Sequence, residues 1–309
     1  MPSKTWRPLP CRRLQGVRIA LSLLWVGLAA CHSKGAGAPV VVTTPGIGAL
    51  PAGCSVVAML APSVSTRVGG VLDAALAKHI ANVSTVGGVD FRRDIHHVRY
   101  CQVDADTPTP RFLLLLAGDI SPTVLEAVAA RPNEKWDREQ IGDSPVVSHG
   151  AFWAAYRGAA GQGGELLLAN DHDLVQRALT NSPGSYPLEV SMPFSAVISG
   201  RAFSRVKRQT AAGQLSVLDA VQELRLSVPP DGRSLGVRVI VANREAAEPL
   251  SQAIGPVLSA ISKKLSRPGD PERKVVAENS GGDVVARMDL PDGTLDALVA
   301  GLSARAIHQ

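Results

Sequence analysis

Arg111-Phe-Leu-Leu-Leu-Leu-Ala-Gly118 is a short apolar run that ends at a glycine, and it predicts a β-strand. The run recurs later in the chain, where Val237–Ile240 corresponds to Leu113–Leu116. Val98-Arg-Tyr100 and Leu224-Arg-Leu226 correspond in the same way, at nearly the same separation. A nearly constant separation indicates a diverged duplication of one β-α-β-β-α-β-β-α unit. The alternative is a succession of two ordinary, unrelated α+β domains.

The chain as a whole alternates hairpin-forming strands with helix-patterned segments. The expected strands are Ser55–Leu60, Ile95–Val103, Arg111–Gly118, Pro145–His149, Ala151–Arg157, Glu165–Ala169, Leu188–Met192, Val221–Val228, Leu235–Ala242, Lys274–Glu278 and Asp283–Leu290. The expected helices lie at about residues 68–80, 122–131, 171–179, 200 onward, 245–261 and 295–302. Runs of hairpins between helices favour antiparallel sheets with helices packed on one face, so we expect an α+β fold. Asn181–Pro187 is rich in turn-forming residues and suggests a boundary between domains at 52–183 and 187–309.

The first thirty residues have the parts of a secretory signal peptide. Residues 1–30 contain no acid, and the apolar run Ile19–Ala30 closes on small residues. The basic residues of this segment are Lys4, Arg7, Arg12, Arg13 and Arg18. A membrane-spanning helix needs roughly twenty apolar residues, and this run is shorter. We therefore expect cleavage of residues 1–30, with an uncleaved membrane anchor as the alternative.

A cysteine follows the small residues directly, in Leu28-Ala29-Ala30-Cys31. This tetrapeptide resembles the lipobox of bacterial lipoproteins. The resemblance implies that Cys31 carries the acyl chains, palmitate among them, and becomes the new N-terminus on a membrane. In that family the next residue helps to sort the product, and His32 is not the Asp associated with retention in the inner membrane. The resemblance therefore implies the periplasmic face of the outer membrane. An ordinary secreted protein with an incidental cysteine remains the alternative.

Residues 31–51 are expected to form a flexible tether between this cysteine and the folded part. Gly, Ala and Pro dominate the stretch. A flexible chain of about twenty residues reaches about 25 Å on average. We therefore expect the lipid to hold the folded part close to the membrane surface.

The remaining cysteines support export. The chain has four cysteines, of which Cys11 lies in the signal segment and Cys31 in the lipobox. Cys54 and Cys101 form an even pair in an oxidising compartment, which predicts a disulfide. Two buried thiols are the alternative. Neither cysteine has a second ligand at zinc-site spacing, so we expect no metal.

The charge and composition exclude several classes of function. The net charge is +5, but the excess of basic residues lies in residues 1–30, so the mature chain is neutral. A nucleic-acid-binding protein needs a basic footprint, and this one disappears with the signal segment. Aromatic residues make up only 4% of the chain, which leaves little for a stacking site. We expect no nucleic-acid partner and no cofactor.

Catalytic motifs are weak. Ser204-Arg-Val-Lys207 matches the Ser-x-x-Lys motif of penicillin-binding enzymes, but the companion motifs of that family are absent. His96 and His97 are adjacent on an expected strand, so they point to opposite faces and cannot share one metal ion. Asp171-His172-Asp173 fits the cap and first turn of a helix better than a catalytic site. We therefore expect a protein that is not an enzyme.

One charged pattern suggests a partner surface. Arg201, Arg205 and Arg208 are spaced to share one face of a helix, where they could contact phosphate-bearing lipid or an acidic partner. A solvated helix face is the alternative. We expect an outer-membrane lipoprotein that acts as a scaffold, assembly accessory or binding module, with an envelope protein as its partner. The alternatives are an envelope hydrolase with scattered residues and capture of a small ligand in a cleft between the halves.

Overall fold

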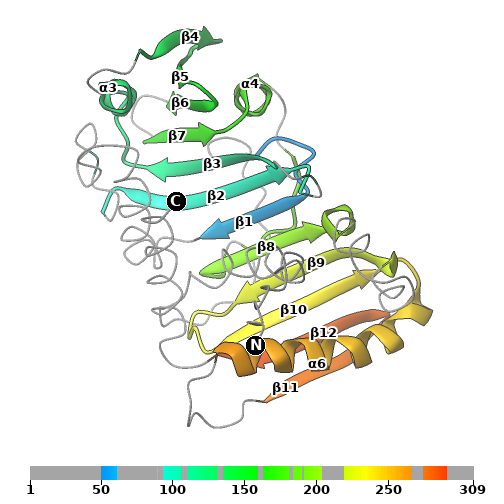
Figure 1. Cartoon of the computed structure of the whole chain (residues 1–309). Coiled ribbons are helices and arrows are strands. Elements are labelled where there is room, and N and C mark those ends of the chain that lie inside the picture. Colours follow the sequence, from blue (N-terminus) through cyan, green and yellow to red (C-terminus); the bar gives the residue numbers. More distant parts are fainter. Residues whose placement is uncertain are drawn as a thin grey trace, which may run out of the picture.

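The computed structural model of the chain describes residues 50–60, 89, 93–105, 107, 110–130, 135–158, 163–180, 184–189, 191–203, 219–265 and 274–290. Within these residues, one twelve-stranded sheet runs in the order β11-β12-β10-β9-β8-β1-β2-β3-β7-β6-β5-β4. Figure 1 shows the strands following one another from β4 at the top to β11 at the bottom. Every pair of neighbouring strands is antiparallel. The α+β class and the antiparallel pairing are confirmed.

The elements have the following bounds. The strands are β1 Val56–Leu60, β2 Ile95–Val103, β3 Arg111–Gly118, β4 Asp137–Ile141, β5 Ser144–His149, β6 Phe152–Gly158, β7 Gly164–Ala169, β8 Phe194–Ser199, β9 Val221–Val228, β10 Ser234–Val241, β11 Val275–Ser280 and β12 Asp283–Asp289. The described α-helices are α3 Thr123–Ala129, α4 His172–Thr180 and α6 Ala247–Leu265. The helices expected at 68–80 and 295–302, the signal segment, the lipobox and most of the tether lie outside the described residues.

Two strands differ from the sequence-based expectation. Strand β4 (Asp-Arg-Glu-Gln-Ile) has no apolar alternation, and it forms through pairing with β5 at the edge of the sheet. The strand expected at Leu188–Met192 is wrong, because the described residues there form a turn in which the Met192 N–H donates to the Glu189 carbonyl at 3.0 Å. The strand is instead β8, between β1 and β9, and five of its six residues are buried.

The two halves of the chain meet at β1 and β8. These strands pair in antiparallel register with Ala58 opposite Ala196, so the sheet continues from residues 52–183 into residues 187–309. From this seam the strands follow the order β1-β2-β3-β7-β6 in one half and β8-β9-β10-β12-β11 in the other. Strands β5 and β4 extend the first half further. Five strands thus have a common spatial order in the two halves, whereas β4 and β5 have no counterpart in the second half.

The sequence alignment of the two halves is wrong by one residue for strands β3 and β10. The paired register carries Val237 through Leu226, Ala196 and Ala58 to Tyr100, and Tyr100 lies opposite Leu114. Val237 therefore shares a face with Leu114 and not with Leu113, the residue with which the sequence aligned it. Because side chains alternate between the faces of a strand, an error of one residue reverses the face.

The helices do not all lie on one face. Val56 and Ala58 of β1 belong to the hydrophobic cluster beneath α6, whereas Val57 belongs to the cluster beneath α4. Leu60 packs against both the α6 cluster and the α3 cluster, so α3 and α6 share a face and α4 covers the other. The prediction of helices on a single face is wrong for α4. The first half has cores on both faces, which is why all six residues of β7 are buried.

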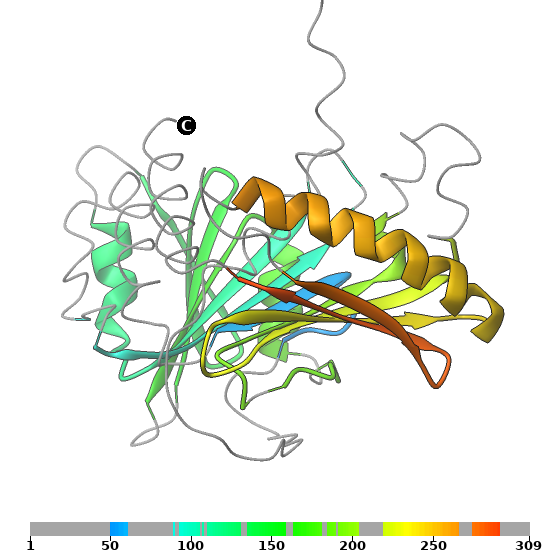
Figure 2. The same ribbon diagram turned by 90° about the horizontal axis from the view of Figure 1, so that it is seen from below.

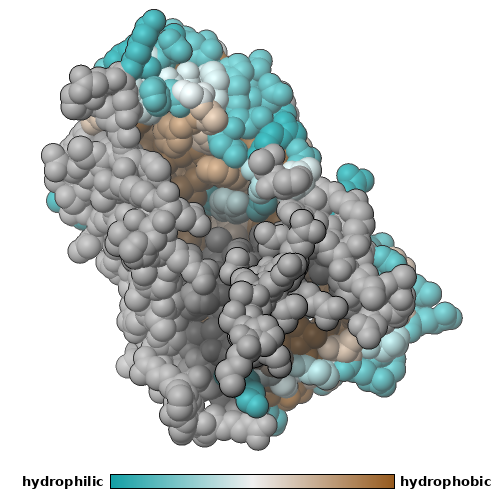
Figure 3. Space-filling model, viewed as in Figure 1, coloured by the Kyte–Doolittle hydropathy of each residue, from teal (hydrophilic) through white to brown (hydrophobic). Residues whose placement is uncertain are grey.

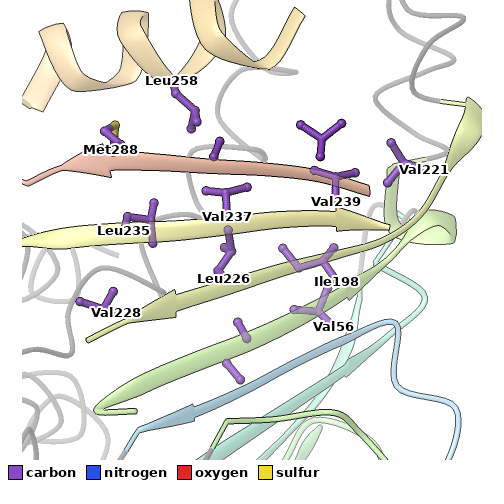
Figure 4. Close-up of a cluster of buried hydrophobic side chains, with 14 of the residues drawn as sticks. Val56, Ile198, Val221, Leu226, Val228, Leu235, Val237, Val239, Leu258 and Met288 are labelled. Atoms are coloured by element: carbon purple, nitrogen blue, oxygen red, sulfur yellow. The ribbon is translucent and has the colours of Figure 1, made fainter. Parts of the chain in front are cut away.

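Helix α6 covers one face of the second half of the sheet (Figure 2). Leu250 and Leu258 of this helix belong to the hydrophobic cluster beneath it. Figure 4 shows Leu258 pointing towards the sheet in this cluster, which also holds Val237 of β10 and Met288 of β12. Pro256 lies inside this helix. None of the described helices combines the length and the hydropathy needed to cross a membrane.

Candidate functional site

The start of the folded part is fastened to the sheet at several points. Cys54 forms a disulfide with Cys101 of β2, with Cα atoms 5.5 Å apart, so this prediction is confirmed. The Tyr186 hydroxyl accepts a hydrogen bond from the Cys54 N–H at 2.9 Å and donates to the Pro51 carbonyl at 2.7 Å. Burial raises the pKa of Tyr186, which keeps the phenol protonated as a donor. The chain is thereby held in place where the expected tether joins it.

A pocket of about 370 Å³ opens beside this fastening. Arg111, at the start of β3, and Asp173, Gln176 and Arg177 of α4 line it. Asp171 caps α4, because its Oδ1 accepts the Leu174 N–H at 3.0 Å, as the sequence indicated. The three helical residues are three and four positions apart, so they share one face of α4. In Figure 3 the surface at the upper right, where Figure 1 places α4, is mainly hydrophilic.

Arg111 is held firmly at one side of this pocket. Its Nε and Nη2 donate to Asp104 Oδ2 at 2.9 and 2.6 Å, and its Nη1 lies 3.6 Å from Asp171 Oδ2. The hydrogen bond to Asp104 is the main cause of a raised pKa for Arg111. Arg111 therefore contributes positive charge, while most of its donors are already in use.

The other charges of the pocket are not paired with one another. Arg177 Nε is buried and has no hydrogen-bond partner, and its Nη1 lies 3.8 Å from where a Cβ on Gly53 would stand. Asp173 and Arg177 have the spacing of a helical ion pair, yet none joins them. Within the part of the chain that the structure describes, the pocket thus holds a guanidinium and a carboxylate apart.

A second polar cluster lies under α4 and is buried. Glu165 of β7 is fully buried, and its Oε2 accepts from Nε and Nη2 of Arg157 at 2.8 and 2.5 Å. Arg157 Nη1 also donates to the Ala178 carbonyl of α4 at 2.8 Å. Burial raises the pKa of Glu165, and Arg157 opposes that rise. Glu165 Oε1 and Arg99 Nε are buried without hydrogen-bond partners. This cluster joins α4 to the sheet and has no nucleophile.

The residues predicted for a partner surface are only partly described. Arg201 is exposed in a 3-10 helix, Gly200–Phe203, and Arg205 and Arg208 lie outside the described residues with Ser204 and Lys207. Their common helix face therefore stays a prediction. Cys31 also lies outside the described residues. Among the described residues, no three His, Cys, Asp or Glu side chains are grouped to hold a metal ion.

Sequence reasoning missed the pocket because its members lie far apart in the chain. Arg111 and Arg177 meet only because β3 pairs with β7 and α4 follows β7 directly. The cap at Asp171 was the one local signal. It predicts where α4 begins, but it does not predict which residues from other elements line the pocket beside the helix. The described pocket is not the cleft that was predicted between the two halves, because all four residues that line it belong to the first half.

The fold defined by these elements is a single long antiparallel sheet with helices on both faces. No protein-family model matches the sequence, and no curated protein matches it significantly. Solved structures do share the fold, among them crystal forms I, III and IV of the protein TP0453. Form I superposes with a TM-score of 0.51 at 9% identity, covering 85% of this chain and 98% of that chain. Form III gives 0.50 at 10% identity, covering 86% and 100%, and form IV gives 0.50 at 9%, covering 85% and 97%. At this identity the likeness concerns the fold alone, and it includes both halves of the sheet.

Proposed function

We propose that this chain is a lipoprotein of the bacterial cell envelope, anchored through acylated Cys31 on the periplasmic face of the outer membrane. The observation that carries the proposal is Leu28-Ala29-Ala30-Cys31 after a basic and apolar leader. The disulfide of Cys54 and its hydrogen bond with Tyr186 support the proposal, because they fix the end of the expected tether to the folded domain. The folded body acts as a scaffold, assembly accessory or binding module.

A binding role is favoured over catalysis by the chemistry of the described sites. The pocket on α4 presents Arg, Gln and Asp side chains, which recognise charged groups, and it has no Ser, Cys or Lys nucleophile beside a base. The buried carboxylate of Glu165 is occupied by Arg157. A small-ligand-binding lipoprotein is the second candidate, and the pocket favours it.

The anchoring proposal is tested with the full chain and a Cys31→Ser variant. We expect the native protein to gain the mass of the acyl chains and to fractionate with the outer membrane. The variant should lose both the added mass and the membrane association. Cross-linking before solubilisation should capture an envelope protein with the native chain and not with the variant. A variant that stayed membrane-bound with unchanged mass would contradict the lipobox interpretation.

We further propose that the two halves descend from one duplicated unit. The support is the common order β1-β2-β3-β7-β6 and β8-β9-β10-β12-β11. The proposal is tested by superposing the two halves of a crystal structure about the Ala58–Ala196 seam. We expect Leu114 to fall on Val237 and Val98 on Leu224, with the same faces inward. Equivalent strands whose side chains point to opposite faces would argue against common descent.

A further inference from the structure

We infer that the pocket lined by Arg111, Asp173, Gln176 and Arg177 binds a zwitterionic headgroup, a phosphate joined to a primary ammonium by a short carbon link. The lipid source of this ligand rests on the anchoring proposed above. The chemical class of the ligand does not rest on that proposal, because it is inferred from the separated positive and negative side chains that line the pocket.

The anionic end of the ligand belongs at Arg177. Its side chain lines the pocket, and its Nε is buried and has no hydrogen-bond partner among the described residues. A guanidinium offers donors in a planar fork that fits phosphate and carboxylate oxygens. Gln176 adds amide donors next to it, and Arg111 adds positive charge from β3.

The cationic end belongs at Asp173. This carboxylate lies one helical turn before Arg177, so the two Cβ atoms are about 5–6 Å apart. A simple anion in the pocket would be repelled by Asp173, whereas a linked ammonium would donate hydrogen bonds to it. Side chains at this spacing usually pair with each other. Here Arg177 instead extends towards Gly53, and both side chains line the pocket of about 370 Å³.

The position of the pocket brings it to the membrane. Gly53, beside Arg177, lies next to the disulfide that fastens the start of the fold. The tether from Cys31 to that point reaches about 25 Å on average. A tethered site meets its ligand at a high effective concentration, so a weak headgroup site would still be occupied.

The test uses the full chain carrying Cys31→Ser, so that binding does not depend on acylation. Co-sedimentation is measured with vesicles of pure phosphatidylcholine and with vesicles that also contain phosphatidylethanolamine or phosphatidylglycerol. The quaternary ammonium of choline, present in all three vesicles, has no N–H to donate, and the phosphatidylglycerol headgroup adds no ammonium. We expect binding to be strongest with phosphatidylethanolamine. Arg177→Gln and Asp173→Asn should each weaken it about tenfold or more, in line with a lost charge-assisted hydrogen bond.

The matched control is Arg138→Gln, which removes an arginine from an exposed ion pair on β4. Its binding should equal that of the parent, and the thermal unfolding of all variants should confirm that they are folded. Free phosphoethanolamine, added at increasing concentration, should compete with the vesicles. Equal binding to all three vesicles, or equal loss in Arg138→Gln and Arg177→Gln, would overturn the inference. If only free phosphoethanolamine binds and vesicles do not, the lipid source is wrong.

Discussion

The buried pair of Arg157 and Glu165 allows a sharp prediction for Arg157→Met. Glu165 is fully buried, and Arg157 supplies its two hydrogen bonds. Methionine keeps the apolar stem of Arg157 and removes the charge, so a carboxylate is left in the interior. Removing one partner of a buried ion pair costs about 3–5 kcal/mol. We expect the free energy of unfolding to fall by about that amount at neutral pH.

The pH dependence of this loss has a definite sign. Burial raises the folded-state pKa of Glu165 above its unfolded value, and Arg157 lowers it again, so Arg157→Met raises it further. A raised folded-state pKa means that the protonated carboxyl is favoured by folding. The penalty of the charged carboxylate is therefore absent below the unfolded pKa and grows as the pH rises towards the folded pKa. The deficit of Arg157→Met should be largest at neutral pH and should shrink on acidification.

The assay is urea unfolding followed by circular dichroism from pH 4 to 8, on four chains. Arg157→Met/Glu165→Gln should recover part of the loss, since the buried carboxylate is removed while the neighbouring Arg99 keeps its charge. Arg138→Met removes the equivalent partner of the exposed Glu126, and it should have a much smaller effect that is nearly independent of pH. Equal losses in Arg157→Met and Arg138→Met, or a deficit that is constant with pH, would refute the reasoning.

Two further predictions concern the scaffold. Replacing both Cys54 and Cys101 by Ala removes the disulfide, which closes a loop whose ends are 47 residues apart. The free energy of unfolding, measured by urea titration, should fall by about 4 kcal/mol. A change below about 1 kcal/mol would contradict the argument from loop entropy. Gly255→Ala should raise the free energy of unfolding by less than the ~1 kcal/mol of helix propensity, because the added Cβ has free space around it but crowds Pro256, the next residue in α6. Gly118→Ala, the control, should destabilise, because its Cβ would stand 1.8 Å from the Asp94 carbonyl oxygen.

Local signals in the sequence were sufficient for much of the fold. Apolar runs located β2 and β3 at their bounds, and Asp171 located the start of α4 through its cap. The disulfide followed from the compartment and the even number of cysteines. These features depend on residues close together in the chain, or on chemistry that is independent of the fold. The charged strand β4 was missed because pairing at the sheet edge, and not apolar periodicity, holds it.

The sequence alone therefore determined most of the strands, the antiparallel class and the disulfide, and it predicts the lipobox with its tether. The tertiary structure alone decided that both halves share one sheet through β1 and β8, that α4 lies on the face opposite α6, and that Val237 aligns with Leu114. It also brought Arg111 and Arg177 to one pocket. Strand pairing and face assignment depend on contacts between distant residues, and a shift of one residue reverses a face, so no local pattern could fix them.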